Sequence, residues 1–398
     1  MSSSFLRHCD ACAGSSTNHT ALWISNSGDM LALFFAGSRN TWIVRTLSGI
    51  GEWAVSLLAH VMFMVGRAFG FLTLSDDITR VTSARSRVMW EDAKRRGIPM
   101  EQLYFFGTPR DTYRIHINGH PYFVDSLPTP PKKQKEALHV DDKISFKTLL
   151  RKANIPTPRS IGTGSLHTAK KVLQEFGTIC VKPRYGSNGF HTFPHVRTET
   201  ELEEAFRSAQ QICTMVSVEE HLEGNLARAT CVDGKLVGFL ASVYPTVIGN
   251  GVDTIAVLIE QKNKTKQKGV SDIVLSSEHI GYIARHGYTP DSVLKEGHSL
   301  PLIFRAGISW GGSNREHGRT IHPSFIPIIE QAAVLTDLPI VGFDLIIKDP
   351  LISADSQSWG FIEANSLPWI NLHHTPFEGE PVNVATHVWD LWTDYPKK

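Results

Sequence analysis

The sequence has almost no net charge, few cysteines and no long uninterrupted apolar run. Its 40 basic and 39 acidic residues leave a formal charge of +1, which gives no electrostatic sign of a nucleic-acid partner. The five cysteines are odd in number and scattered, unlike the framework of a disulfide-rich secreted protein, so we expect a reducing, cytoplasmic setting. What remains is a composition of 41% hydrophobic and 20% charged residues, which is typical of a globular protein.

Residues 53–74 come nearest to a membrane segment. His60 and Arg67 interrupt this stretch, whereas a spanning helix needs about 20 nearly continuous apolar residues. We therefore expect a packed or membrane-surface helix, which leaves weak membrane attachment open. The first residues also lack the basic region, apolar run and cleavage site of a signal peptide.

Two cysteines near the start have the spacing of half a zinc site. Cys9 and Cys12 form a Cys-x-x-Cys pair, and His8 and His19 lie nearby. No second Cys-x-x-Cys pair follows. The sequence therefore favours a frayed N-terminus, with metal binding as the alternative.

The chain is long enough for two or three domains, and we divide it into three parts. Residues 1–75 form an N-terminal region that is partly apolar, flexible or membrane-associated, and no chemistry can be assigned to it. Residues 76–135 contain a helix that we expect from Ser75 to Gly97, a strand at 103–106 and a hairpin around Asn118-Gly119. A proline-rich linker, residues 128–135, closes this part.

The third part, residues 136–398, alternates helices and strands and includes hairpins, which predicts an α+β fold. Helices are expected at residues 141–153, 168–176, 199–211 and 323–336, and strands at residues 178–182, 215–218, 228–232, 236–243, 340–347 and 360–363.

The last two expected strands carry three oxygen-bearing side chains. Asp344 lies within an apolar strand, where a buried carboxylate needs a compensating partner. Glu363 and Asn365 share one face of the next strand because strand side chains alternate. If the strands are antiparallel neighbours, these oxygens converge into a set that suits magnesium and substrate phosphates. The alternative is a surface hairpin with scattered polar residues.

A second candidate site follows the strand at residues 178–182. That strand ends in Lys182, a residue type that often binds phosphate as a point charge. The loop after it contains two glycines, which let backbone N–H groups approach phosphate oxygens closely. The loop residues concerned are Gly186, Ser187, Asn188 and Gly189. An ordinary turn after a strand is the alternative.

A third candidate is the strand at residues 215–218, which runs into Glu219, Glu220 and Leu222. The backbone of such a segment can offer donors and acceptors to the edge of an adenine. Taken alone, the pattern is more typical of a solvated strand end.

In their order along the chain, these pieces resemble the ATP-grasp superfamily of ATP-dependent ligases, over about residues 141–392. The resemblance implies two α+β subdomains that clasp ATP, preceded by a pre-ATP-grasp region. It implies phosphate contacts from Lys143 and Lys182 and an adenine-reading hinge at Glu219, Glu220 and Leu222. The metal ligands implied are Asp344, Glu363 and Asn365, with Mg²⁺, or alternatively Mn²⁺, as the ion.

A more specific resemblance is to the ATP-grasp domains of cyanophycin synthetase and bifunctional glutathione synthase. Segments at residues 247–263, 309–312, 321–323 and 378–385 carry it. It implies amide-bond formation through an acyl-phosphate, with Arg305 and Arg228 near the transferred phosphate or the substrate carboxylate. We therefore expect small-molecule carboxylate and amine substrates, no nucleic acid, and assembly into a homo-oligomer.

Several positions depart from the pattern. Leu226 stands where relatives often have an acidic residue for the ribose, Asn250 replaces a usual aspartate, and Gly307 replaces a usual asparagine. Leu226 and Gly307 favour one alternative, a nucleotide-binding protein that no longer ligates. A ligase attached to a membrane through residues 53–74 is a second alternative.

Overall fold

The structure is a computed structural model that describes residues 7–12, 16–38, 66, 68–81, 83–133, 138–186 and 189–393. The expectations for Ser187 and Asn188, and for most of the apolar stretch at 53–74, lie outside the described residues. Within that stretch, residues 72–74 belong to a strand, β3 (Leu72–Ser75), so the helix predicted there is wrong at its C-terminal end. None of the described helices combines the length and apolar character needed to cross a bilayer.

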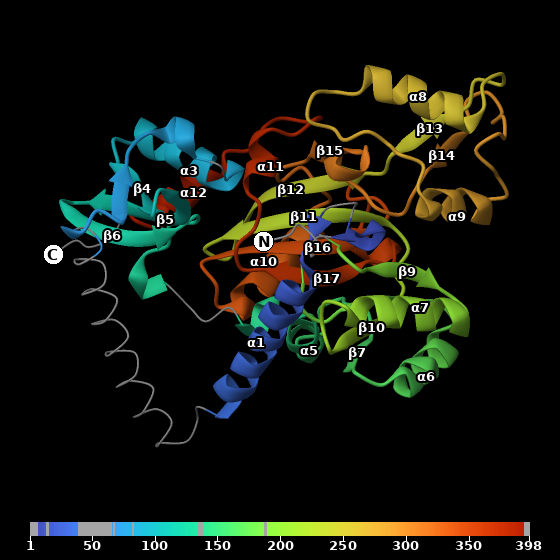
Figure 1. Cartoon of the computed structure of the whole chain (residues 1–398), viewed down its shortest axis with the longest axis horizontal. Helices are drawn as coiled ribbons and strands as arrows, with labels where there is room; N and C mark the ends of the chain where they lie inside the picture. Colours follow the sequence, from blue (N-terminus) through green and yellow to red (C-terminus); the bar gives the residue numbers. More distant parts are fainter. Residues whose placement is uncertain are drawn as a thin grey trace.

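One unit consists of a four-stranded antiparallel sheet in the order β3-β4-β5-β6, covered by helices α3 and α12. Figure 1 shows it at one end of the molecule, with the red α12 packed among its blue and cyan elements. The bounds are β4 (Met100–Phe105), β5 (Thr108–Ile117), β6 (His120–Asp125), α3 (Ala84–Arg95) and α12 (Val384–Asp390). The indole N–H of Trp389 donates to the carbonyl of Met89 at 3.0 Å, which fastens α12 to α3.

The hairpin predicted at Asn118-Gly119 is confirmed. Both residues have positive φ angles, 51° and 80°, as a two-residue turn of the favoured hairpin type requires. The predicted start of the helix at Ser75 is wrong, because Ser83 caps α3 with its side chain. Asp77 instead caps a separate 3-10 turn, Ile78–Arg80. A cap residue alone does not show how long the following helix is.

A second sheet has the order β7-β10-β8-β9 and is entirely antiparallel. Helices α6 and α7 bury their apolar faces against it. The bounds are β7 (Ser160–Thr163), β8 (Ile179–Pro183), β9 (Phe193–Val196), β10 (Val216–Glu220), α6 (Leu166–Phe176) and α7 (Glu199–Gln210). Each helix and strand expected between residues 168 and 218 is present, with ends shifted by three residues or fewer.

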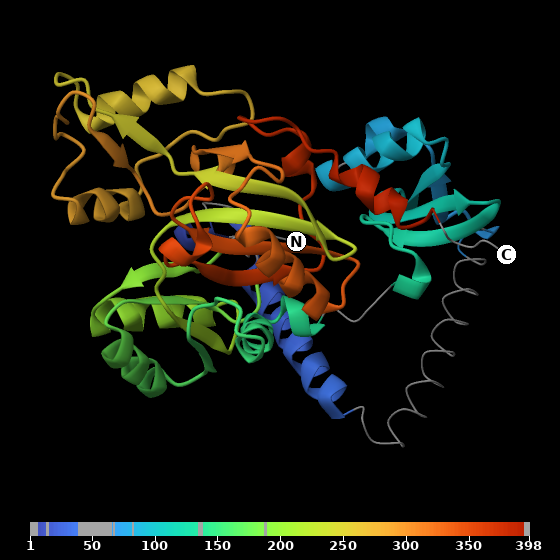
Figure 2. The same cartoon turned by 180° about the vertical axis from the view of Figure 1, so that it is seen from behind.

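The central sheet has five antiparallel strands in the order β15-β12-β11-β16-β17. One face carries the largest apolar cluster and packs against α5 and α10. The bounds are β11 (Asn225–Val232), β12 (Lys235–Val243), β15 (Ser313–Glu316), β16 (Ile340–Ile347), β17 (Gly360–Asn365), α4 (Leu138–Asp141), α5 (Lys143–Lys152) and α10 (Phe325–Thr336). Figures 1 and 2 show the second sheet next to this one, with α5 beside both.

The remaining described elements lie around these three sheets. A two-stranded sheet of β13 (Thr246–Ile248) and β14 (Ser299–Pro301) packs with α8 (Ile255–Thr265) and α9 (Ser277–Arg285). Helix α11 (Asn371–His374) follows β17. At the N-terminus, β1 (Arg7–His8) pairs with β2 (Ser16–Thr17), and helix α1 (His19–Ser38) runs past α4 and α5 (Figure 1).

Candidate active site

Three charged side chains form a row across the central sheet. Arg228 on β11 pairs in register with Asp344 on β16, which in turn pairs with Glu363 on β17. Residues directly opposite each other on neighbouring strands point to the same face. The opposite face is the apolar one that packs on α5 and α10. The charged row therefore lies on the face that these helices leave uncovered.

The guanidinium of Arg228 balances the charge of Asp344. Its Nε donates to Asp344 Oδ1 at 2.8 Å and its Nη2 to Asp344 Oδ2 at 3.0 Å. This two-bond geometry is the strong form of such a pair. The pKa of Arg228 is raised, because the attraction of Asp344 outweighs the effect of burial. Arg228 is thus the compensating partner that we expected for a carboxylate within an apolar strand.

The third proposed oxygen ligand, Asn365, stands opposite Gly342, two positions along the strand from Asp344. On the other side of Asp344 the register of the two strands shifts. Asp344 pairs with Glu363, but the next residue, Leu345, pairs with Phe361, so Ile362 forms a bulge. The carbonyl of Ile362 accepts a 3.5 Å hydrogen bond from Lys182 Nζ. Bulges often occur beside active sites, where they redirect strand groups. The structure therefore brings Asp344, Glu363 and Asn365 to one part of one sheet face.

Lys143 joins this face to the glycine-containing loop. It is the first residue of α5, whose N-cap is Asp142. Its Nζ lies 3.2 Å from Glu363 Oε1 and donates to the carbonyl of Gly186 at 2.7 Å. A cation held between a carboxylate and the first residue of the glycine-containing loop can hold an anionic group between the two sheets.

Lys182 belongs to a buried group of three charges. Its Nζ is 3.0 Å from Glu219 Oε2, while Lys147 Nζ is 2.6 Å from Glu219 Oε1. The hydroxyl of Ser217 donates to the same carboxylate at 2.7 Å. Lys147 is one helical turn from Lys143, so both lysines lie on one side of α5. The group connects α5 of the central layer to β8 and β10 of the second sheet.

The pKa values of this group follow from burial and attraction. Burial alone would raise the pKa of Glu219, but the two lysines lower it to about 2. Burial lowers the pKa of Lys147 to about 8, although Glu219 opposes that change. Burial would likewise lower the pKa of Lys182, yet the attraction of Glu219 and Glu363 raises it. Lys182 therefore keeps its positive charge at neutral pH.

Arg305 lies on a different part of the site from Arg228. Its Nε donates to Glu278 at 2.9 Å, and its Nη1 and Nη2 donate to the carbonyls of Gly189 and Thr192 at 2.7 and 3.3 Å. Its guanidinium also lies over the ring of Trp310. The structure thus places Arg305 on the end of the glycine-containing loop and Arg228 on the carboxylates.

The predicted adenine hinge comprises the last two residues of β10, Glu219 and Glu220, and Leu222 just beyond it. The carboxylate of Glu219 faces the two lysines, and its main chain pairs in register with Ser160 of β7 and Cys180 of β8. Glu220 is partly exposed and pairs with Arg159 at 3.2 Å, while its N–H bonds to the carbonyl of Arg159. Leu222 is half-buried close to Gly360 on β17. Leu226, on β11, pairs in register with the apolar Ile346.

Some polar groups at the site escaped the sequence patterns. Asp141 accepts bonds from both the N–H and the hydroxyl of Ser366, at 2.8 and 2.7 Å, which fixes the turn after Asn365. His373 bonds to Thr230 at 2.7 Å and to Glu316 at 2.5 Å. This last group resembles a nucleophile–base–acid arrangement, but His373 is 0% exposed. It acts as a buried structural network.

Comparison with known proteins identifies the fold. The chain is 31% identical over 312 residues to cyanophycin synthetase of Trichormus variabilis, which covers 76% of this chain and 34% of that protein. It is 26% identical over 319 residues to the glutathione biosynthesis bifunctional protein GshAB of Clostridium perfringens, covering 77% of this chain and 40% of the relative. No family model matches the chain.

A solved structure gives the same answer. The bifunctional glutathione synthetase of Pasteurella multocida superposes with a TM-score of 0.54 at 22% identity, covering 78% of this chain and 43% of that one. The predicted α+β ATP-grasp fold and the resemblance to ATP-grasp ligases are therefore confirmed. The chain spans about a third to two fifths of the length of the relatives it matches.

Proposed function

We propose that the chain is an ATP-dependent carboxylate–amine ligase that forms an amide bond through an acyl-phosphate, on amino-acid or peptide substrates. The observation that carries this proposal is the convergence of Lys143 and Lys182 on a sheet face with two carboxylates in register. The names of the relatives, cyanophycin synthetase and glutathione biosynthesis protein, support the same reaction class. The cytoplasmic setting and the homo-oligomer stay predictions.

The residues at the carboxylate row fit a divalent cation. Asp344 and Glu363 lie directly opposite each other, an arrangement that repulsion disfavours unless cations lie nearby. Arg228 and Lys143 each neutralise one of them from the side. Asn365 adds a neutral oxygen, and hard oxygen ligands suit Mg²⁺, with Mn²⁺ as the alternative. When bound, this ion would neutralise charge on the substrate phosphates.

The chain's own residues then divide the work of phosphoryl transfer. Lys143 and Lys182 hold the phosphate chain, and the N–H groups of Gly186 and Gly189 approach its oxygens; the phosphate contacts expected of Ser187 and Asn188 stay predictions. Arg228 keeps the Asp344 carboxylate in place, and Arg305 holds the loop and offers positive charge near the transferred group. Positioning and electrostatics dominate this class of reaction, so no protein nucleophile is needed.

The substrate carboxylate attacks the γ-phosphorus of ATP, so a C–O–P bond forms and ADP leaves. The amine nitrogen then adds to the acyl carbon and loses a proton. The bond between that carbon and the phosphate oxygen breaks, so inorganic phosphate leaves and the amide remains. Both steps require exclusion of water from the acyl-phosphate. Gly186, which accepts a hydrogen bond from Lys143, and Gly189, which accepts one from Arg305, would contribute to that cover.

A screen of amino-acid and dipeptide pairs for ADP release, with mass spectrometry of the product, tests the proposal. We expect ADP to form only when both an acid and an amine are present. The alternative, a nucleotide-binding protein without ligation, is favoured by the apolar surroundings of Leu226, where a ribose ligand is expected. ATP binding without turnover for any pair would support that alternative.

A further inference from the structure

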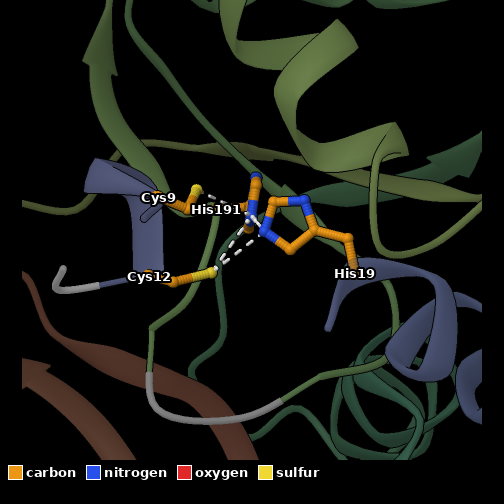
Figure 3. Close-up of side chains that lie close together, drawn as sticks. All are labelled: Cys9, Cys12, His19 and His191. Atoms are coloured by element: carbon orange, nitrogen blue, oxygen red, sulfur yellow. Dashed lines mark hydrogen bonds between the residues drawn. The ribbon is translucent and has the colours of Figure 1, made fainter. Parts of the chain in front are cut away.

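Four metal-ligating side chains from distant parts of the chain point at one spot (Figure 3). Cys9 and Cys12 come from the short N-terminal segment, His19 begins α1, and His191 lies in the loop between β8 and β9. Their sulfur and nitrogen atoms all lie within 4.8 Å of one another. The sequence pattern contained Cys9, Cys12 and His19 but not His191, which lies 172 residues beyond His19.

The separations within the cluster match one tetrahedral ion. Tetrahedral zinc with ordinary bond lengths places nitrogen ligands about 3.4 Å apart and sulfur and nitrogen ligands about 3.6 Å apart. Here the two imidazole Nε2 atoms of His19 and His191 are 3.4 Å apart. Sulfur–nitrogen distances are 3.3 Å for Cys12–His191, 3.5 Å for Cys12–His19 and 3.7 Å for Cys9–His191.

The His191 ring is held from behind in the way that metal ligands are. Its Nε2 faces the cluster, and its Nδ1 lies 2.9 Å from the hydroxyl of Ser208 on α7. Such a bond on the second ring nitrogen fixes the orientation of a metal-binding histidine. The ring is 0% exposed, and its backbone has a φ of 51°, a conformation that only a well-determined environment maintains. The backbone N–H of His191 donates to the carbonyl of Ala11 at 3.0 Å.

The N-terminal segment also has little else to hold it in place. Its two strands, β1 and β2, contain two residues each, too few for an apolar core of their own. Yet Cys12 is 0% exposed against the body of the protein. Small elements of this kind usually depend on a metal or on disulfides, and no disulfide joins the described cysteines.

We propose that Cys9, Cys12, His19 and His191 bind one structural zinc ion. Two sulfur and two nitrogen ligands in a closed tetrahedron are the donor set of structural zinc sites. A two-iron cluster is the other centre that uses two cysteines and two histidines. It places the sulfur pair and the nitrogen pair on different irons, farther apart than the distances found here.

The ion ties the N-terminus to the glycine-containing loop. His191 lies between Gly189 and Thr192, the two residues whose carbonyls bind Arg305. A second attachment lies on α1, where Asn26 Nδ2 donates to the carbonyl of Ile212 at 2.6 Å. The zinc site thus fastens residues 7–12 and 16–38 to the second sheet. It does not depend on the proposed ligase activity, because no substrate takes part.

Elemental analysis of the purified full-length chain tests the proposal without any nucleotide. We expect one zinc ion per chain, and at least a tenfold loss of zinc in Cys9→Ser and in His191→Gln. Cys180→Ser is the matched control, because Cys180 is partly buried like Cys9 and lies on β8 outside the cluster. It should retain full zinc content. Circular dichroism reports whether each variant is folded.

A second measurement on the unmodified chain keeps the test decisive if a variant fails to fold. Replacement of zinc by Co²⁺ should give the visible absorption of a tetrahedral, thiolate-bound ion at one equivalent. Removal of the metal should make residues 7–38 sensitive to limited proteolysis. A chain that holds no zinc and shows no thiolate–cobalt absorption would overturn the proposal, as would equal zinc content in Cys9→Ser and the control.

Discussion

At the scale of single residues, Glu219 is the centre of the buried three-charge group that contains Lys147 and Lys182. Its carboxylate is shared by Lys147 and Lys182, and its own exposure is 1%. Its neighbour Glu220 is partly exposed and pairs only with Arg159 in the contacts described. Two adjacent glutamates on one strand therefore form a buried and an exposed ion pair, so the same substitution at the two positions compares burial directly.

We expect Glu219→Gln to lower the free energy of unfolding by about 3–5 kcal/mol, because it leaves two buried ammonium groups without a counter-charge. Glu220→Gln should cost less than about 1 kcal/mol, as exposed ion pairs do. Urea unfolding at neutral pH measures both. Equal, small losses in the two variants would contradict the buried three-charge group.

The pH dependence of this difference has a defined sign. The pKa of Glu219 is lowered from 4.5 to about 2, so its stabilising effect is complete above pH 4.5 and disappears as pH falls towards 2. The stability gap between the unmodified chain and Glu219→Gln should therefore narrow over that acid range. The two chains should be compared below pH 8, because the pKa of Lys147 is about 8 and this lysine loses its positive charge above that pH. A gap that stays constant down to pH 2.5 would contradict this assignment.

At the scale of elements, the positions of the strands were largely predictable from the sequence, whereas their registers and partners were not. The apolar strands that contain Asp344, Lys182 and Glu363 are recognisable from the sequence. The link between Lys147 and Glu219 spans 72 positions, and no local pattern contains it. The site of His191 escaped prediction for the same reason. The helix start at Ser75 failed because both Asp77 and Ser83 are good caps, and packing selected the second.

The loop between β8 and β9 is the element whose position depends most on Arg305. Arg305→Ala removes two bonds to loop carbonyls, each about 1.5–3 kcal/mol for a charged donor. We expect the affinity for ATP to fall about tenfold or more, as measured by calorimetry. Arg315→Ala is the control, because Arg315 is exposed and pairs with Glu378 at the surface. Unchanged ATP affinity in Arg305→Ala would remove the loop from the proposed site.

At the scale of the whole molecule, the order of elements brings distant segments to one place. The carboxylate row comes from the central sheet, the lysines from α5 and β8, and the loop from the second sheet. The C-terminal helix α12 returns to the unit formed by residues 81–127, where Trp389 and Trp392 are buried. The resemblance to ATP-grasp ligases indicated the fold, but it gave no sign that helices α1 and α12 pack on different parts of the protein.

The central claim is that the carboxylate row and the two lysines support ATP-dependent ligation. The most direct test is ADP release in the presence of Mg²⁺ and an accepted acid and amine, comparing the unmodified chain with Glu363→Gln. Glu363 suits this test better than Asp344, because loss of the Asp344 charge would leave the partly buried guanidinium of Arg228 without its carboxylate partner. We predict that Glu363→Gln abolishes ADP release while its unfolding transition is retained. Undiminished ADP release by a folded Glu363→Gln chain would contradict the account.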